Sequence, residues 1–255
     1  MYLHDHSLLV LIVTENFQRE TGRMQDISHH LQAVLKRMAI ASLQAGRDAA
    51  DIQLLAVSKT MPIAAIVQAY EAGQRHFGEN YVQEAVEKID ALAHLPLTWH
   101  LIGPLQSNKT AVVAAHFHWV HSIERLKIAQ RLSVQRAADL PPLNLCIQVN
   151  IDDEQSKSGC HVLDVEALVK AILPLPRVIL RGLMIIPKAG NDVAFQQLTA
   201  LRQHLLATIP TLDAAVFDTL SMGMSADMEA AIAAGSTMVR VGTAIFGQRT
   251  QQILE

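Results

Sequence analysis

Eight short apolar segments recur along the chain, and a longer segment with the pattern of an amphipathic helix follows most of them. The apolar segments are LLAVS (54–58), HFGE (76–79), WHLIG (99–103), WVHS (119–122), LCIQVN (145–150), ILRGLM (179–184), FDTLSM (217–222) and VRVGTAIFG (239–247). This alternation predicts consecutive β-then-α units, and therefore a parallel sheet covered by helices. Eight such units close a barrel of about 250 residues, and this chain has 255. We predict an α/β fold, a single (β/α)8 TIM-type barrel.

The alternative fold is an open, doubly wound parallel sheet. Its dinucleotide-binding form carries a GxGxxG turn after the first strand, and none follows LLAVS here. Upstream of that strand, the apolar residues fall on one face of a helix, so we expect an extra N-terminal helix on the barrel. That face comprises Ile27, Leu31, Val34, Leu35 and Met38. We expect residues 1–24 to be a poorly ordered N-terminal extension and residues 25–255 to form the barrel.

The helix after the first strand has the clearest signals. Thr60 is its predicted N-cap, Pro62 lies in its first turn and Gly73 ends it. Its predicted buried face is made of Ile63, Ile66, Val67 and Tyr70.

Charge and cysteine content exclude several classes of protein. The formal net charge is −3, which argues against a broad basic surface for nucleic acid. No apolar run approaches the roughly 18 residues that span a bilayer. The run Leu8–Val13 is too short for the core of a typical signal peptide, and Asp5 instead of a basic cluster precedes it. Two cysteines are too few for a disulfide framework. We expect a cytoplasmic monomer that binds neither nucleic acid nor membrane, with Cys146 in the core and Cys160 exposed.

Lys59 directly follows the first predicted strand, at the end of the barrel where active sites form. Desolvation of its stem would lower the pKa of the ammonium group, and a neutral amine can attack an aldehyde to form a Schiff base. The alternative is an ordinary lysine in a solvated loop, or a partner for the glutamate of HFGE. Position alone leaves both interpretations open.

Two turns near the C-terminus indicate a phosphate site. The segment LSMGMS (220–225) ends the seventh predicted strand, and GTA (242–244) lies in the eighth, after Arg240. Barrels commonly bind phosphate at the loops of these two strands. Both segments place small residues and backbone N–H groups beside a helix start, and Ser221, Ser225 and Thr243 add hydroxyl donors. A simple capping turn is the alternative for SMGMS. Combined with Lys59, the two turns favour an aldehyde that carries a phosphate, and pyridoxal 5′-phosphate (PLP) fits that description.

The motifs and their order resemble the YggS/PROSC family of PLP-binding proteins. They are LLAVSKTMP, HFGENYVQE, WHLIGPLQSNK, the pattern Asn150-Glu154-Lys157-Gly159, RGLM and LSMGMSADMEAAIAAGSTMVRVGTAIFG. The resemblance covers about residues 26–249. It implies a barrel like the N-terminal domain of alanine racemase, and a role in vitamin B6 and amino-acid homeostasis without an established turnover reaction.

The resemblance also implies roles for individual residues. PLP would form an aldimine with Lys59, and Asn80 would lie beside the cofactor ring. Arg240 would face the pyridine nitrogen. The phosphate would be held, largely by backbone amides, at Ser221, Met222, Gly242 and Thr243.

The alternative function is that of a PLP-dependent, racemase-like enzyme. An arginine beside the pyridine keeps its proton and leaves the ring nitrogen unprotonated, which makes the ring a poorer electron sink. Racemisation also needs acid–base groups on both faces of the cofactor, and alanine racemases supply one as a tyrosine from a second domain, for which no residues remain here. We therefore expect a PLP carrier or buffer with no catalytic residues, whose recipients are apo PLP-dependent enzymes.

Three histidines gather around the fourth predicted strand: His116, His118 and His121. Histidine is a common metal ligand, but no cysteine or carboxylate completes a site here. We predict a structural role for them and no metal site.

Overall fold

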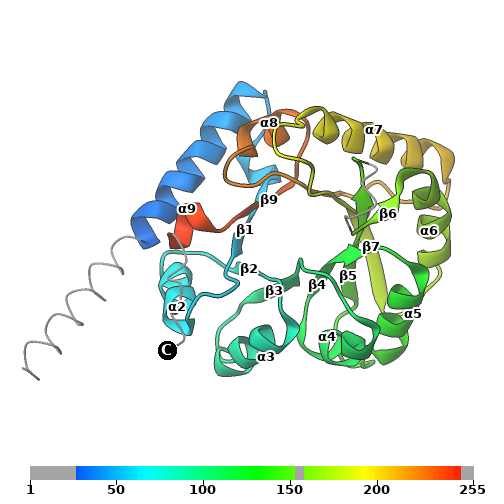
Figure 1. The fold of residues 1–255 in the computed structure, drawn as a ribbon, viewed down its shortest axis with the longest axis horizontal. Coiled ribbons are helices and arrows are strands. Elements are labelled where there is room, and N and C mark those ends of the chain that lie inside the picture. The colour runs from blue at the N-terminus through cyan, green and yellow to red at the C-terminus, as the bar shows by residue number, and fades with distance from the viewer. Residues whose placement is uncertain (1–26, 153–157, 248–255) are drawn as a thin grey trace, which may run out of the picture.

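The computed structural model of the protein describes residues 27–152 and 158–247, in which parallel strands form a closed barrel surrounded by helices (Figure 1). The barrel strands are β1 (Gln53–Val57), β2 (His76–Glu79), β3 (Thr98–Leu101), β4 (Trp119–Ile123), β5 (Leu143–Asn150), β7 (Val178–Met184), β8 (Thr219–Ser221) and β9 (Met238–Val241). They follow the order β4-β3-β2-β1-β9-β8-β7-β5, and a pairing between β4 and β5 closes the ring. The predicted (β/α)8 barrel is confirmed, and the open sheet is excluded.

The helices lie on the outside of the barrel and cover the outward faces of the strands (Figure 1). They are α2 (Ile63–Glu71), α3 (Val82–Ala91), α4 (Thr110–His116), α5 (Leu126–Gln135), α6 (Val165–Ile172), α7 (Val193–Thr208), α8 (Met228–Ala233) and α9 (Thr243–Phe246), with short 3-10 turns η1 (Ala49–Asp51), η2 (Ser107–Lys109) and η3 (Val162–Asp164). Side chains of successive strand residues point to opposite faces of the sheet. Those on the outer face pack against the apolar faces of the helices in one continuous core.

A helix over residues 27–44 precedes the barrel, as the sequence predicts. Four of its five predicted apolar positions are buried: Ile27, Leu31, Val34 and Met38. Leu35 is 37% exposed, because it lies beyond the edge of the buried stripe. The helix lies beside α8 and α9 (Figure 1), where Arg37 forms a salt bridge with Glu229 and Arg47 donates to the carbonyl of Ile232. The N-terminal helix therefore packs against the helices that the C-terminal part of the chain forms.

The predicted N-cap at Thr60 is wrong. Helix α2 begins at Ile63 after an N-cap at Pro62, and Thr60 has a positive φ of 62°. The buried face is also rotated from the prediction: Ala65, Ile66 and Ala69 are buried, whereas Ile63 is 39% exposed. The small alanines let the helix approach the strands closely.

Two further details differ from the prediction at the strand ends. The last strand does not run through residues 239–247 but ends at Val241, because Gly242 turns the chain into α9. A short additional strand, β6 (Cys160–His161), pairs with the end of β5. The predicted exposure of Cys160 is therefore wrong, since this pairing leaves it 6% exposed, while Cys146 is buried as predicted.

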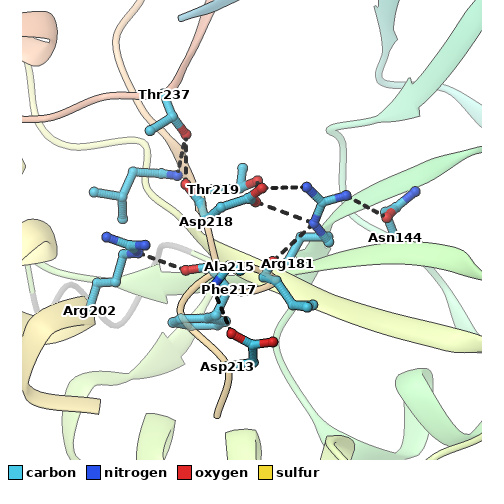
Figure 2. A network of polar contacts seen from close by, with 11 residues as sticks. Asn144, Arg181, Arg202, Asp213, Ala215, Phe217, Asp218, Thr219 and Thr237 are labelled. Atoms are coloured by element: carbon cyan, nitrogen blue, oxygen red, sulfur yellow. Dashed lines mark hydrogen bonds and ion pairs between the residues drawn. The ribbon is translucent and has the colours of Figure 1, made fainter. Parts of the chain in front are cut away.

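A polar network joins residues of β5, β7 and the segment before β8 near the ends of the strands opposite Lys59 (Figure 2). Arg181 lies between Asp218 and Asn144, with Nη2 donating to Asp218 at 2.6 Å and Nη1 donating to Asn144 at 3.2 Å. Its guanidinium also lies 5.0 Å from the centre of the Trp119 ring. The carboxylate of Asp218 therefore balances the charge of Arg181 at the end of the barrel opposite Lys59.

Replacing Gly182 on β7 with alanine should destabilise the fold by more than about 3 kcal/mol. A Cβ atom there would overlap the backbone carbonyl of Thr219 on the neighbouring strand, and backbone cannot move as a side chain does. Gly46 is the matched control, because its φ is +66° but a Cβ atom meets nothing within 4 Å. Gly46→Ala should lose only about 1 kcal/mol. Urea denaturation of both variants measures the difference, and equal losses would contradict the role of the β7–β8 contact.

Candidate functional site

A cavity of about 360 Å³ opens at the C-terminal ends of the strands. Its lining residues lie at or after the ends of β1, β2, β3, β7, β8 and β9. They are Val57, Lys59, Met61, Asn80, Ile102, Ile186, Met224, Ser225, Ala226, Arg240, Gly242, Thr243 and Gly247. Five of the seven predicted site residues are among them: Lys59, Asn80, Arg240, Gly242 and Thr243. The barrel therefore brings together side chains from opposite ends of the sequence.

The segment that carries Lys59 is fixed on both sides of that residue. On one side, the ammonium of Lys88 donates to the carbonyl of Ser58 at 2.8 Å. On the other, the N–H of Thr60 donates to Glu84 Oε1 at 2.6 Å. Lys88 and Glu84 themselves pair at 2.6 Å along α3. The left-handed backbone of Thr60, unfavourable for a β-branched residue, is thus held by the same helix that clamps its neighbour.

A buried glutamate completes the set of contacts, called the clamp below, by which Lys88 and Glu84 hold Ser58 and Thr60. Glu79, the last residue of β2, is fully buried, accepts from the Ser58 hydroxyl at 2.6 Å and pairs with Lys88 at 2.9 Å. Burial raises the pKa of Glu79, and the positive charge of Lys88 opposes that shift. Reasoning from the sequence missed Lys88 and Glu84; their four-residue spacing in NYVQEAVEK was the available signal.

Arg240 lies at the floor of the cavity and is 4% exposed. Its Nη1 donates to the hydroxyl of Ser221 at 2.9 Å, and its Nη2 donates to the carbonyl of Ile185 at 2.8 Å. Burial lowers the pKa of Arg240 to about 10, which still leaves the guanidinium charged at neutral pH. The fixed cation gives the deep end of the cavity a positive charge.

The structure places the predicted phosphate residues unequally. Gly242 and Thr243 line the cavity, whereas Ser221 and Met222 are fully buried and are not among its lining residues. The LSMGMS turn instead presents Ser225 and Ala226 to the cavity. These two residues and Thr243 have backbone N–H groups that donate to no other residue in the part of the chain that the structure describes. Amides of both turns are therefore available to an anionic ligand.

The side chain of Asn80 adds a second unsatisfied group. Its Oδ1 atom is buried and has no hydrogen-bond partner within the described ranges 27–152 and 158–247. A buried polar atom without a partner is unfavourable, and in a binding site it commonly awaits a ligand. An amine, a fixed cation, two turns with available amides and this amide oxygen together fit a phosphorylated aromatic aldehyde.

Other candidates lie outside this cavity. A shallow cavity of about 480 Å³, lined in part by Glu124, Cys160 and His161, contains none of the predicted site residues. Glu154 and Lys157 of the family pattern lie outside the described residues. No group of histidine, cysteine or carboxylate side chains suited to a metal ion occurs among the described residues. Within the same ranges, no helix combines the length and apolar character that crossing a bilayer requires.

The fold and site define a class of protein: a (β/α)8 barrel with a lysine at its mouth and a buried arginine at the floor of the same cavity. Residues 29–250 match the family described as "Alanine racemase, N-terminal domain", and the chain belongs to that family. Solved alanine racemases share the fold: that of Corynebacterium glutamicum has a TM-score of 0.63 at 16% identity, covering 91% of this chain and 64% of that one.

More similar relatives make the assignment more specific. Two proteins named "Pyridoxal phosphate homeostasis protein", from Pseudomonas aeruginosa and Escherichia coli K12, are each 54% identical to this chain, covering 89% of it and 97% and 98% of the relatives. PipY of Synechococcus elongatus, solved with PLP bound, has a TM-score of 0.73 at 39% identity, covering 87% of this chain and 100% of that one. The resemblance to the YggS/PROSC family is confirmed.

Proposed function

We propose that this protein binds pyridoxal 5′-phosphate through Lys59 and acts in PLP and amino-acid homeostasis as a carrier or buffer, without a turnover reaction of its own. The observation that carries the proposal is the single cavity shared by Lys59, Arg240 and the available amides of the two C-terminal turns. The 54% identical relatives named for PLP homeostasis support it. A cytoplasmic location, a monomeric state, apo PLP-dependent enzymes as recipients and a separate extension at residues 1–24 remain parts of this proposal.

Each residue would have a defined task toward the cofactor. When bound, PLP supplies an aldehyde that a lysine amine can attack. Lys59, held between the clamped residues Ser58 and Thr60, would provide that amine. Amides of Ser225 and Thr243, with Gly242, would hold the phosphate. The roles of Ser221 and Met222 would then be to support the turn and Arg240 from behind, since neither lines the cavity.

Arg240 favours binding over catalysis. A guanidinium donates and does not accept, so a ring nitrogen facing it would accept a hydrogen bond and stay unprotonated. Such a ring withdraws electrons poorly from a bound amino acid. Among the described residues, the cavity lining also contains no tyrosine or histidine that could move a proton on the opposite face. Both features weigh against the racemase alternative.

The absorption spectrum of the purified protein before and after addition of an amino acid tests the function. We expect a visible band from lysine-bound PLP that borohydride removes, and a change of that band when the amine of the amino acid displaces Lys59. A protein that stays colourless when supplied with PLP would contradict the proposal. Sustained racemisation at about 1 per second or faster would instead favour an enzyme.

A further inference from the structure

Three histidines from separate strands form an unbroken chain of hydrogen bonds through the interior of the barrel. His121 Nδ1 lies 2.9 Å from the hydroxyl of Ser221, and His121 Nε2 lies 3.0 Å from His100 Nδ1. His100 Nε2 lies 3.0 Å from His76 Nδ1. Ser221 accepts from Arg240, so the chain begins at the floor of the cavity. It ends at the first residue of β2, on the opposite end of the barrel.

The first step of the chain crosses the barrel interior, and the later steps join side chains of the neighbouring strands β4, β3 and β2. Ser221 is on β8 and His121 is on β4, and these strands are separated by β7 and β5 in the sheet. Ser221, His121 and His100 are fully buried, whereas His76 is partly exposed. His100 also stacks on Trp119, with 5.3 Å between ring centres. Solvent therefore reaches the chain at its His76 end, and packing holds the rest in place.

Arg240 fixes the direction of every hydrogen bond in this chain. A guanidinium can only donate, so Ser221 accepts from it and has one hydroxyl proton left to donate. Among the contacts of the described residues, His121 Nδ1 is the acceptor for that proton. In the reverse arrangement His121 would donate to Ser221, and a buried hydroxyl proton would have no acceptor, which is unfavourable. A neutral His121 that accepts at Nδ1 carries its proton on Nε2, so it donates to His100, which in turn donates to His76.

We propose that Ser221 and His121 are positioning residues for Arg240, and that His100 and His76 fix their orientation as neutral Nε2–H tautomers. The neutral state agrees with the environment, because burial lowers the pKa of His121 to about 3 and lowers that of His100 well below its ordinary value. Positioning means that two of the five N–H donors of Arg240 are held by Ser221 and Ile185, so that the guanidinium plane is fixed where it lines the cavity. This inference rests on the proposed function only in taking a pyridine ring as the group that Arg240 meets.

The chain itself can be tested without cofactor. Long-range ¹⁵N–¹H NMR correlations of histidine-labelled, ligand-free protein at neutral pH distinguish the two neutral tautomers from the charged ring. We expect His121, His100 and His76 all to be neutral and protonated on Nε2. A proton on Nδ1 of His121, or a charged His100, would overturn the proposed direction, whatever the protein does with PLP.

Two substitutions then test positioning. His121→Asn places an amide near the Nδ1 position and can keep an acceptor for Ser221, whereas His121→Leu removes it. We expect His121→Leu to broaden the side-chain NMR signals of Arg240 in ligand-free protein and to weaken PLP binding about tenfold, with His121→Asn close to the wild type. His116→Asn, at a partly exposed histidine of α4 that takes no part in the chain, is the control and should change neither.

Inorganic phosphate separates positioning from a general structural effect. Phosphate meets the two turns but carries no ring for Arg240, so its affinity should be the same in the wild type and in His121→Leu. If phosphate and PLP weaken equally, or if the Arg240 signals stay sharp in His121→Leu, His121 supports the fold alone and the proposal is wrong. If the Arg240 signals broaden while PLP binding is unchanged, Arg240 does not meet the ring and the positioning role also fails.

Discussion

Lys59→Ala should abolish covalent attachment of PLP and raise the Kd for PLP at least about 100-fold, which corresponds to about 2.7 kcal/mol. The substitution removes the amine in the cavity lining that can attack the aldehyde, whereas the amides of the two turns and Arg240 remain. Residual binding should therefore resemble that of a phosphorylated ring held by hydrogen bonds alone. Borohydride treatment followed by mass spectrometry of the intact chain and its peptides measures the attachment, and equilibrium dialysis measures the affinity.

Lys127→Ala is the matched control for Lys59→Ala. Lys127 is exposed on α5, away from the cavity, so its removal should leave both the attachment and the Kd unchanged. Stoichiometric attachment in Lys59→Ala, or loss of attachment in Lys127→Ala, would show that another amine carries the cofactor.

The barrel could be predicted from the sequence because its strands are buried on both faces. Such strands are continuous apolar runs, and eight of them with helix-sized intervals leave few alternatives to a closed ring. Prediction failed where a backbone conformation departs from the usual signal. Thr60 has the residue type of an N-cap but a positive φ, and Gly242 ends the last strand although the apolar residues 244–246 follow it.

The candidate site could be predicted only as far as the strand ends define it. Lys59 lies two residues after the end of β1 and Gly242 directly follows β9, and both line the cavity. The motif predicts that Ser221 holds the phosphate in the cavity. Ser221 is instead the last residue of β8, and its side chain faces the barrel interior below Arg240. A shift of one residue along a strand reverses the face to which a side chain points, and the sequence does not specify where β8 ends.

Contacts between distant elements could not be predicted at all. His121 and Ser221 are 100 residues apart, and nothing local in either strand indicates that they meet across the barrel. His118, by contrast, accepts from the N–H of Trp99 and takes no part in the chain, although it lies three residues from His121. His118 and His121, which the sequence groups in one cluster, therefore lie in two unrelated environments.

Lys88→Met should lower the free energy of unfolding by about 3–5 kcal/mol. Lys88 is 4% exposed and pairs with the fully buried Glu79, so its removal leaves a buried carboxylate without its cation. The substitution also removes the hydrogen bond to the carbonyl of Ser58, so the segment that carries Lys59 should loosen and PLP attachment should slow. Urea denaturation of the ligand-free protein measures the first effect, and the rate of PLP attachment measures the second.

Lys170→Met on α6 is the matched control for Lys88→Met. Lys170 pairs with Glu166 at the same spacing of four residues and the same distance of 2.6 Å as Lys88 with Glu84, but both partners are solvent-exposed. Exposed pairs are screened by water, so its loss of stability should be far smaller. Lys88→Met combined with Glu79→Gln should recover part of the stability, because the uncompensated charge is gone. Equal losses in Lys88→Met and Lys170→Met would mean that the clamp beneath Lys59 contributes no more than a surface ion pair.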